Sequence, residues 1–207
     1  MDLIAGAGKG GGPNIKVISG TNFSTVLYNF FAFEPNFTGG VTLSSADLDG
    51  DLYSDIIVGA GPGGGPRIKA FSGRNLSLLK DFFAFEPTFS GGVNIATSLI
   101  NGDATPDIVV GAGSGGGPRL KVFDGSNLSV LLDFFVYAPV FRGGVYVAAG
   151  NLDGLANHEI VVGAGDGGGP AAGLVVGDAL FPCRWPPDQG AGGALLPAEQ
   201  RGVPVHP

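Results

Sequence analysis

The chain has 207 residues, among them 39 Gly, 15 Pro and 15 Phe, and 44% of its residues are hydrophobic. So many aromatic side chains argue against a disordered chain, because large apolar surfaces bury themselves. Eighteen acidic residues against 11 basic ones give a formal charge of −7, which disfavours nucleic-acid binding. No apolar run reaches the roughly 20 residues that a membrane-spanning helix needs. The single Cys183 excludes an intrachain disulfide.

A glycine-rich octet ending in Pro recurs four times, over residues 6–13, 59–66, 111–118 and 163–170, at spacings of 53, 52 and 52 residues. Two other landmarks keep the same phase. The first is Phe-x-Gly-Gly-Val, at 37–41, 89–93 and 141–145, and the second is an aromatic segment ending in Pro, at 29–35, 81–87 and 133–139. The sequence is therefore one module copied along the chain, a pattern that predicts a repeat architecture.

One module contains four runs that are typical of strands. In the copy that starts at Phe37 we expect them at 40–45, 56–60, 67–71 and 78–85, with a hairpin turn at 72–75. Gly or Pro interrupts every window long enough for a helix. Four short strands in each repeat of about 52 residues are typical of a propeller blade. A β-helix fits less well, because the nine-residue period of calcium-binding β-helices is absent.

We therefore predict an all-β fold, a partial β-propeller of about three four-stranded blades over residues 1–170, with incomplete first and last blades. The remaining blades of a parent propeller would complete it. Residues 171–207 lack the sequence motifs of the repeat and contain six Pro and the only Trp instead. A shifted reading frame is our hypothesis for this tail, and a natural disordered tail is the alternative.

Acidic residues concentrate in the segment between the first two predicted strands of each module. Asp47, Asp49, Asp51 and Asp55 fall within nine residues, and such crowding is unfavourable without a counter-ion. Calcium binds six to eight oxygens in flexible loops, so these carboxylates and the carbonyl of Tyr53 are predicted calcium ligands. The alternative is a set of Asx turns that only start a strand.

The second and third copies of this loop have fewer acids, and we expect weaker metal sites there. Their candidate ligands are Asn101, Asp103 and Asp107 in the second loop, and Asn151, Asp153 and Glu159 in the third.

The Phe-x-Gly-Gly-Val segment, the Asp-x-Asp-Gly-Asp loop and a following Ile-x-Val-Gly-Ala-Gly together resemble the FG-GAP (VCBS) repeat of integrin-α-like β-propellers. The resemblance covers about residues 2–170. It implies that the acidic loop is a calcium site between the first and second strands of a blade. Two departures stand out. Leu52 occupies a position where the family usually has Gly, and Gly61, with its counterparts in later modules, stands where the family name has Pro.

The resemblance also implies a secreted or cell-surface, non-catalytic protein that binds another protein or a glycan. We expect no export signal at the start of this chain, because residues 1–6 contain no Lys or Arg. The alternative is an accessory propeller of a secreted hydrolase or lyase whose catalytic domain lies elsewhere in the parent protein. Neighbouring domains would distinguish the two.

Other motifs lead to no enzymatic prediction. Residues 6–11 match a dinucleotide-binding fingerprint, but a Pro and a strand-like run follow where a helix is required. We find no arrangement typical of a catalytic triad or a zinc site. Two Phe clusters, at 30–33 and 82–85, are expected to fill the space between blades, and His158 is expected to be solvated.

Overall fold

The computed structural model describes residues 2–168 and the backbone of residues 172–175. The described residues form 14 strands and no helix, so the prediction of an all-β chain is confirmed for them. None of the described segments is a helix with the length and hydropathy to cross a membrane. The predicted tail lies outside the described residues from residue 176 onward.

The strands are short and recur in the phase of the sequence repeat. They are β1 Leu3–Gly6, β2 Asn14–Ile18, β3 Val26–Phe31, β4 Val41–Ala46, β5 Asp55–Ala60, β6 Arg67–Phe71, β7 Leu78–Phe83, β8 Val93–Ser98, β9 Asp107–Ala112, β10 Arg119–Phe123, β11 Val130–Phe135, β12 Val145–Gly150, β13 Glu159–Ala164 and β14 Ala172–Val175. The last strand, β14, pairs with β13, and the predicted boundary at residue 170 stays a prediction.

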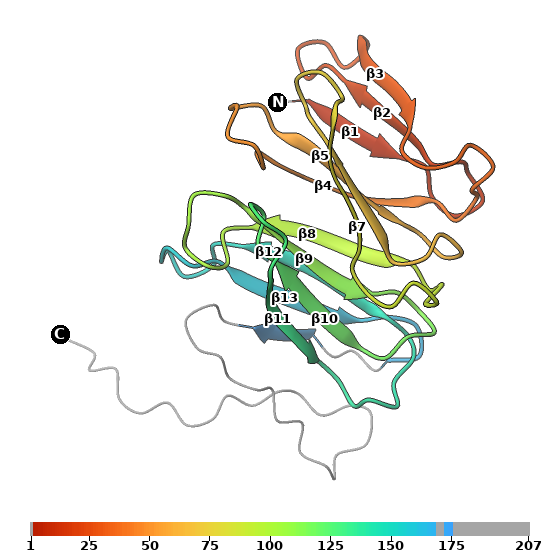
Figure 1. The fold of residues 1–207 in the computed structure, drawn as a ribbon, viewed down its shortest axis with the longest axis vertical. Coiled ribbons are helices and arrows are strands. Elements are labelled where there is room, and N and C mark those ends of the chain that lie inside the picture. Colours follow the sequence, from red (N-terminus) through yellow and green to blue (C-terminus); the bar gives the residue numbers. More distant parts are fainter. Residues whose placement is uncertain (1, 169–171, 176–207) are drawn as a thin grey trace, which may run out of the picture.

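Four open antiparallel sheets contain these strands, each in sequence order (Figure 1). The first sheet is β1-β2-β3, the second β4 to β7, the third β8 to β11 and the fourth β12-β13-β14. The register repeats at the level of single residues. Leu43 pairs with Val58 in the second sheet, and the pairs 95–110 and 147–162 occupy the same positions in the third and fourth. The copied sequence thus gives copied strand pairing.

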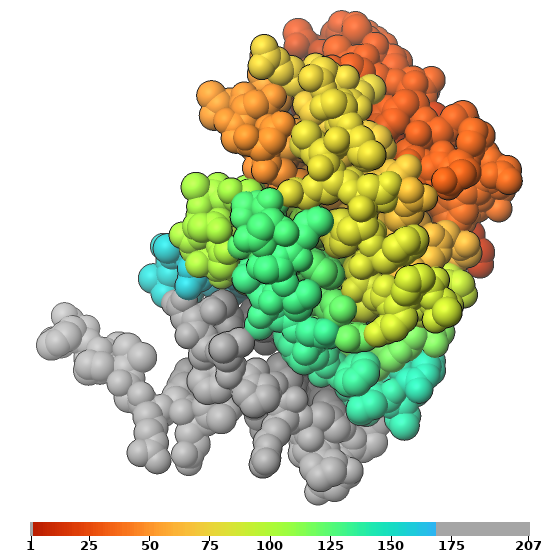
Figure 2. Space-filling model, viewed as in Figure 1, coloured from red at the N-terminus to blue at the C-terminus, as the bar shows by residue number. Residues whose placement is uncertain are grey.

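Successive sheets pack face to face, and the hydrophobic core lies between them as three clusters. The strands β5 and β9 are buried along their whole length, because each contributes side chains to two clusters. Ile56 packs toward the first sheet, whereas its neighbour Ile57 packs toward the third. This alternation follows from the period of two along a strand. Figure 2 shows the second and third modules, yellow and green, packed against each other on one face.

The first strands of the modules lie side by side, since β4 contacts β8 and β8 contacts β12. Side-chain hydrogen bonds join them at matched positions. The hydroxyl of Thr42 donates to the carbonyl of Val93 at 2.9 Å, and the side-chain amide of Asn94 donates to the carbonyl of Val145 at 2.8 Å. These bonds fix how one sheet follows the next.

Two predictions about the aromatic segments were wrong in part. The fourth strand of the second sheet ends at Phe83 and not at residue 85, because the chain turns inward there and buries Ala84 and Phe85. Phe82 lies edge-on to Phe123 of the next sheet, with ring centroids 5.1 Å apart, as expected for a residue between sheets. Phe31 and Phe83, however, are 52% and 50% exposed, because adjacent strand residues point to opposite faces.

Candidate metal centre

The first acidic loop connects the end of β4 to the start of β5, and its carboxylates accept hydrogen bonds from the loop's own backbone. Asp47 accepts from the amides of Gly50 at 2.7 Å and Leu52 at 2.8 Å. Asp49 accepts from the amide of Asp51 at 3.2 Å. These are Asx-type turns, so the alternative interpretation of the loop describes part of its geometry correctly.

Leu52 adopts a left-handed backbone conformation, with a φ of 71°. This region disfavours residues that carry a Cβ atom, and it explains why a Gly would suit the position. The side chain of Leu52 is 91% exposed and contributes no buried surface that would offset this strain. Leu52 therefore holds a left-handed turn that Gly would adopt without this strain.

Asp55, the first residue of β5, is fully buried at the base of the loop. One of its carboxylate oxygens accepts from the amide of Leu48 at 2.8 Å, and the other accepts from the amide of Gly73 at 3.0 Å. This carboxylate therefore joins the acidic loop to the hairpin between β6 and β7. Burial raises the pKa of Asp55, these two backbone bonds oppose the rise, and the nearby charges of Asp49 and Asp47 add to it.

The side chains of Asp47, Asp49 and Asp55 converge. Each offers a carboxylate oxygen, and these oxygens all lie within 4.8 Å of one another. Oxygens that bind one Ca²⁺ at about 2.3–2.6 Å are separated by at most about 5 Å, so the spacing fits a shared cation. The group can hold a metal ion. A bound cation would compensate the negative charge of Asp55, which is unfavourable when it is buried without a counter-ion.

One predicted carboxylate ligand of this loop, Asp51, is not among the converging side chains. The carboxylate of Asp51 accepts from the amide of Tyr53 at 2.9 Å, which closes another turn of the loop. The carbonyl oxygen of Tyr53 stays a prediction as a ligand. Among the residues that the structure describes, the three converging aspartates are the one group of three or more acidic, His or Cys side chains with metal-binding spacing.

The second loop is organised differently. The side-chain amide of Asn101 donates to the carboxylates of Asp103 at 2.8 Å and of Asp124 at 3.4 Å. Asp107 is fully buried and accepts from the amides of Ile100 and Asn101. Asp124, from the hairpin between β10 and β11, was missed by the sequence analysis. The sequence does carry a signal for it: the hairpin has an acid, Asp124, where the preceding module has Ser72.

The third loop has turns of the same kind. Asn151 accepts from the amide of Gly154 at 2.6 Å, Asp153 from that of Leu155 at 2.8 Å, and Glu159 from that of Leu152 at 2.6 Å. The expectation that His158 is solvated was wrong. The residue is half-buried, its ring nitrogen Nδ1 lies 2.6 Å from the hydroxyl of Ser98, and its amide donates to the carbonyl of Leu99. It links this loop to the third sheet.

The buried acids Asp55, Asp107 and Glu159 thus recur at one position and hold each loop on its sheet. What distinguishes the first loop is that it has acids at both positions 47 and 49 and that these converge with the buried acid. The matching residues are Leu99 and Asn101 in the second loop and Asn151 and Asp153 in the third. No protein-family model matches this chain, and no curated protein matches it.

Proposed function

We propose that this chain is a non-catalytic, calcium-stabilised β-propeller segment of the FG-GAP (VCBS) type that serves protein or glycan binding at the cell surface or in the extracellular space. The observation that carries the proposal is the convergence of Asp47, Asp49 and Asp55 at the first turn of a repeated four-stranded sheet. A cation held there would stabilise the fold, because it would bind the native arrangement of the three carboxylates in preference to the unfolded chain.

The arrangement of the sheets supports the propeller part of the proposal. Propeller blades are four-stranded antiparallel sheets in sequence order whose first strands lie nearest the axis. Here the second and third sheets have that order, and β4, β8 and β12 are neighbours. The core between successive sheets is what repeated units require, because each unit buries its faces only against its neighbours.

The position of the acidic loop supports the stabilising role of calcium. Asp55 connects the loop to the hairpin of Gly73, so a cation at the three carboxylates would tie both turns to the same edge of the sheet. It would also relieve the repulsion among the aspartates. A ligand present at about 100 times its dissociation constant stabilises the folded state by about 2.7 kcal/mol. An extracellular setting would supply calcium at millimolar levels suited to modest sites.

Thermal unfolding with saturating Ca²⁺ and with EGTA tests the proposal. We expect calcium to raise the Tm of the full chain, and Asp49→Ala to remove most of that rise. Asp166→Ala is the matched control, because it deletes one exposed acid outside the three loops and should keep the calcium response. Equal Tm values with calcium and with EGTA would contradict the proposal, as would an Asp49→Ala variant that responds like the parent.

A further inference from the structure

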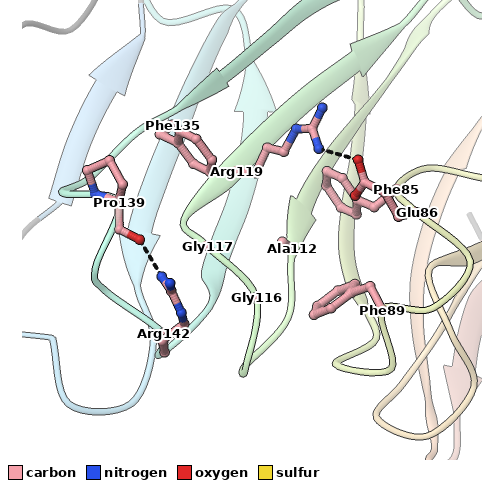
Figure 3. Close-up of a pocket in the computed structure, with 10 residues that line it drawn as sticks. All are labelled: Phe85, Glu86, Phe89, Ala112, Gly116, Gly117, Arg119, Phe135, Pro139 and Arg142. Carbon is pink, nitrogen blue, oxygen red and sulfur yellow. Dashed lines mark hydrogen bonds and ion pairs between the residues drawn. The ribbon is translucent and has the colours of Figure 1, made fainter.

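A groove with a volume of about 370 Å³ lies between the second and third modules (Figure 3). One wall contains Glu86 and Phe89, from the segment that follows β7, and the other contains Phe135 and Arg142. The glycines at 116–117 run between the two walls. A Cβ atom on the first of them would lie 2.8 Å from the ring of Phe89, and one on the second would lie 2.7 Å from the ring of Phe135. A side chain at either position would therefore press against one of the rings.

Arg142 occupies a position where the two preceding modules have a small hydroxyl residue. Its carbonyl oxygen accepts from the amide of Gly115 at 2.8 Å. The matching residues Thr38 and Ser90 accept in the same way, also at 2.8 Å, from the amides of the corresponding octet glycines. The structural contribution of this position is thus made by the backbone in every module. The third module differs from the others at this position by a long side chain with a positive charge.

The positive charge of Arg142 has no acidic partner among the described residues. Its guanidinium is exposed and donates to the backbone carbonyls of Phe141, at 3.1 Å, and of Pro139. The other arginine of the groove, Arg119, differs in this respect. It pairs with Glu86 at 2.8 Å and with Asp133 at 2.7 Å, so its charge is already balanced. Within the part of the chain that the structure describes, an arginine without an acidic partner thus lies at one end of the groove, which makes the groove complementary to an anion.

The rest of the groove is suited to a ring that is apolar on one side and carries hydroxyl groups. Phe135 is 48% exposed and offers an aromatic surface beside Gly117. The side chain of Glu86 is 66% exposed, so its carboxylate has oxygens available as acceptors in addition to the bond from Arg119. Pockets of about 300 Å³ or more with a few convergent polar groups are typical small-ligand sites.

We propose that this groove binds a carboxylate-bearing sugar, a uronate residue of an acidic glycan. The guanidinium of Arg142 pairs with the sugar carboxylate, Phe135 packs against the apolar face of the ring, and Glu86 accepts from hydroxyl groups. The inference rests on the proposed function, in which the chain binds a protein or a glycan, and it specifies the binding site and the class of glycan. An acidic peptide could satisfy Arg142 but would leave the hydroxyl acceptors of the groove unused.

The preceding module supplies a matched comparison. The corresponding groove has a volume of about 380 Å³ and is lined by Glu34, Phe37 and Arg67 among others. Its position matching Arg142 is Ser90. The two grooves share one wall, which contains an edge-on pair of Phe rings (33 and 37, or 85 and 89) and a Glu–Arg ion pair. The residues that line the earlier groove include no counterpart of Phe135 or Arg142. Acidic sugar should therefore bind at the later groove and not at the earlier one.

Calorimetric titration of the full chain with trigalacturonate, a neutral galactose trisaccharide and the peptide Gly-Asp-Gly tests the proposal. We expect the acidic sugar to bind at least about tenfold more tightly than the other two probes, and Arg142→Ser to weaken it at least about tenfold, the loss expected for one charge-assisted contact. Phe135→Leu should also weaken it. Phe83→Leu, the matched change in the earlier module, should leave it unchanged.

Unchanged affinity in Arg142→Ser, or no binding of trigalacturonate by a chain with a normal melting transition, would overturn the proposal. Equal binding of the peptide and the acidic sugar, lost together in Arg142→Ser, would instead assign the groove to peptide carboxylates and would also overturn it. The titration is run in EGTA as well as in Ca²⁺. A calcium-dependent Tm without sugar binding refutes this inference alone, whereas Arg142-dependent binding without a calcium response refutes only the proposed calcium site.

Discussion

The guanidinium of Arg67 donates two hydrogen bonds to the carboxylate of Asp81, from Nε at 2.8 Å and from Nη2 at 2.7 Å, across the pair β6–β7. In the first sheet the same two positions are Asn14 and Asn29, and their side chains are hydrogen-bonded at 2.9 Å. A side-chain hydrogen bond therefore joins these two strands in both sheets, but it is charged only in the second. Arg67 also reaches Glu34 of the first sheet at 3.4 Å, so the charged form links neighbouring sheets.

The charged pair predicts a pH dependence. The bond from Arg67 holds the pKa of Asp81 below its ordinary value, so the pair stabilises the fold above the ordinary carboxyl pKa and is lost as the pH falls through the lowered one. Between about pH 6 and pH 3 we expect the parent to lose roughly 1 kcal/mol more unfolding free energy than the double variant Arg67→Asn/Asp81→Asn. Urea unfolding measures this, and parallel pH profiles for the two proteins would contradict it.

Leu52 predicts a stabilising substitution. Because its φ is 71° and its side chain is exposed, Leu52→Gly should raise the unfolding free energy by about 1 kcal/mol. Ala104 is the matched control in the second loop, where the backbone has a negative φ. Ala104→Gly should lower stability by about 0.5–1 kcal/mol. Chemical denaturation compares the two variants. A loss of stability in Leu52→Gly would contradict the claim that Leu52 is strained.

Gly8 and Gly113 occupy the same position of the octet but have different surroundings. A Cβ atom on Gly113 would lie 2.1 Å from the carbonyl oxygen of Gly91, whereas one on Gly8 would meet no heavy atom within 4 Å among the described residues. Gly113→Ala should therefore cost about 1–3 kcal/mol, and Gly8→Ala should cost little. Thermal melts distinguish them, and equal Tm shifts would show that the contact with Gly91 is relieved at no cost.

Phe82 and Phe83 are neighbours in sequence with opposite roles. Phe82 packs edge-on against Phe123 between two sheets, and Phe83 is half-exposed. Phe82 is partly buried, so Phe82→Ala should lower the unfolding free energy by about 2 kcal/mol, less than for a fully buried aromatic residue, and Phe83→Ala by less than half of that. Denaturant midpoints measure both. A larger loss from Phe83→Ala would mean that its exposed ring is covered in solution.

Sequence reasoning could predict the strands because the repeat shows the same turn signals several times. The third strand of the second module begins and ends at the predicted residues, Arg67 and Phe71. The fourth strand was predicted two residues too long, since nothing in a run of aromatic residues indicates that Ala84 and Phe85 turn inward. Which of two adjacent Phe residues is buried also depends on the strand register, which the hydrophobic run does not specify.

The candidate site was predictable where its ligands are close in sequence. Asp47, Asp49 and Asp55 share one loop, and spacing alone indicated that they could converge. Asp124 and Arg142 could not be found in this way. Asp124 reaches the second loop from a hairpin 23 residues after Asn101, and Arg142 faces a wall that another module provides. Such juxtapositions come from the packing of sheets and from strand pairing, which local sequence does not encode.

Calorimetric titration of the full chain with Ca²⁺ tests the account most directly. The convergence of Asp47, Asp49 and Asp55, and of no other such group among the described residues, predicts that the tightest calcium site of the chain lies at the first loop. Asp47→Asn/Asp49→Asn should abolish that binding, while Asn101→Ala in the second loop should leave it intact. Absence of calcium binding by the parent, or an undiminished tightest site in the double variant, would contradict the account.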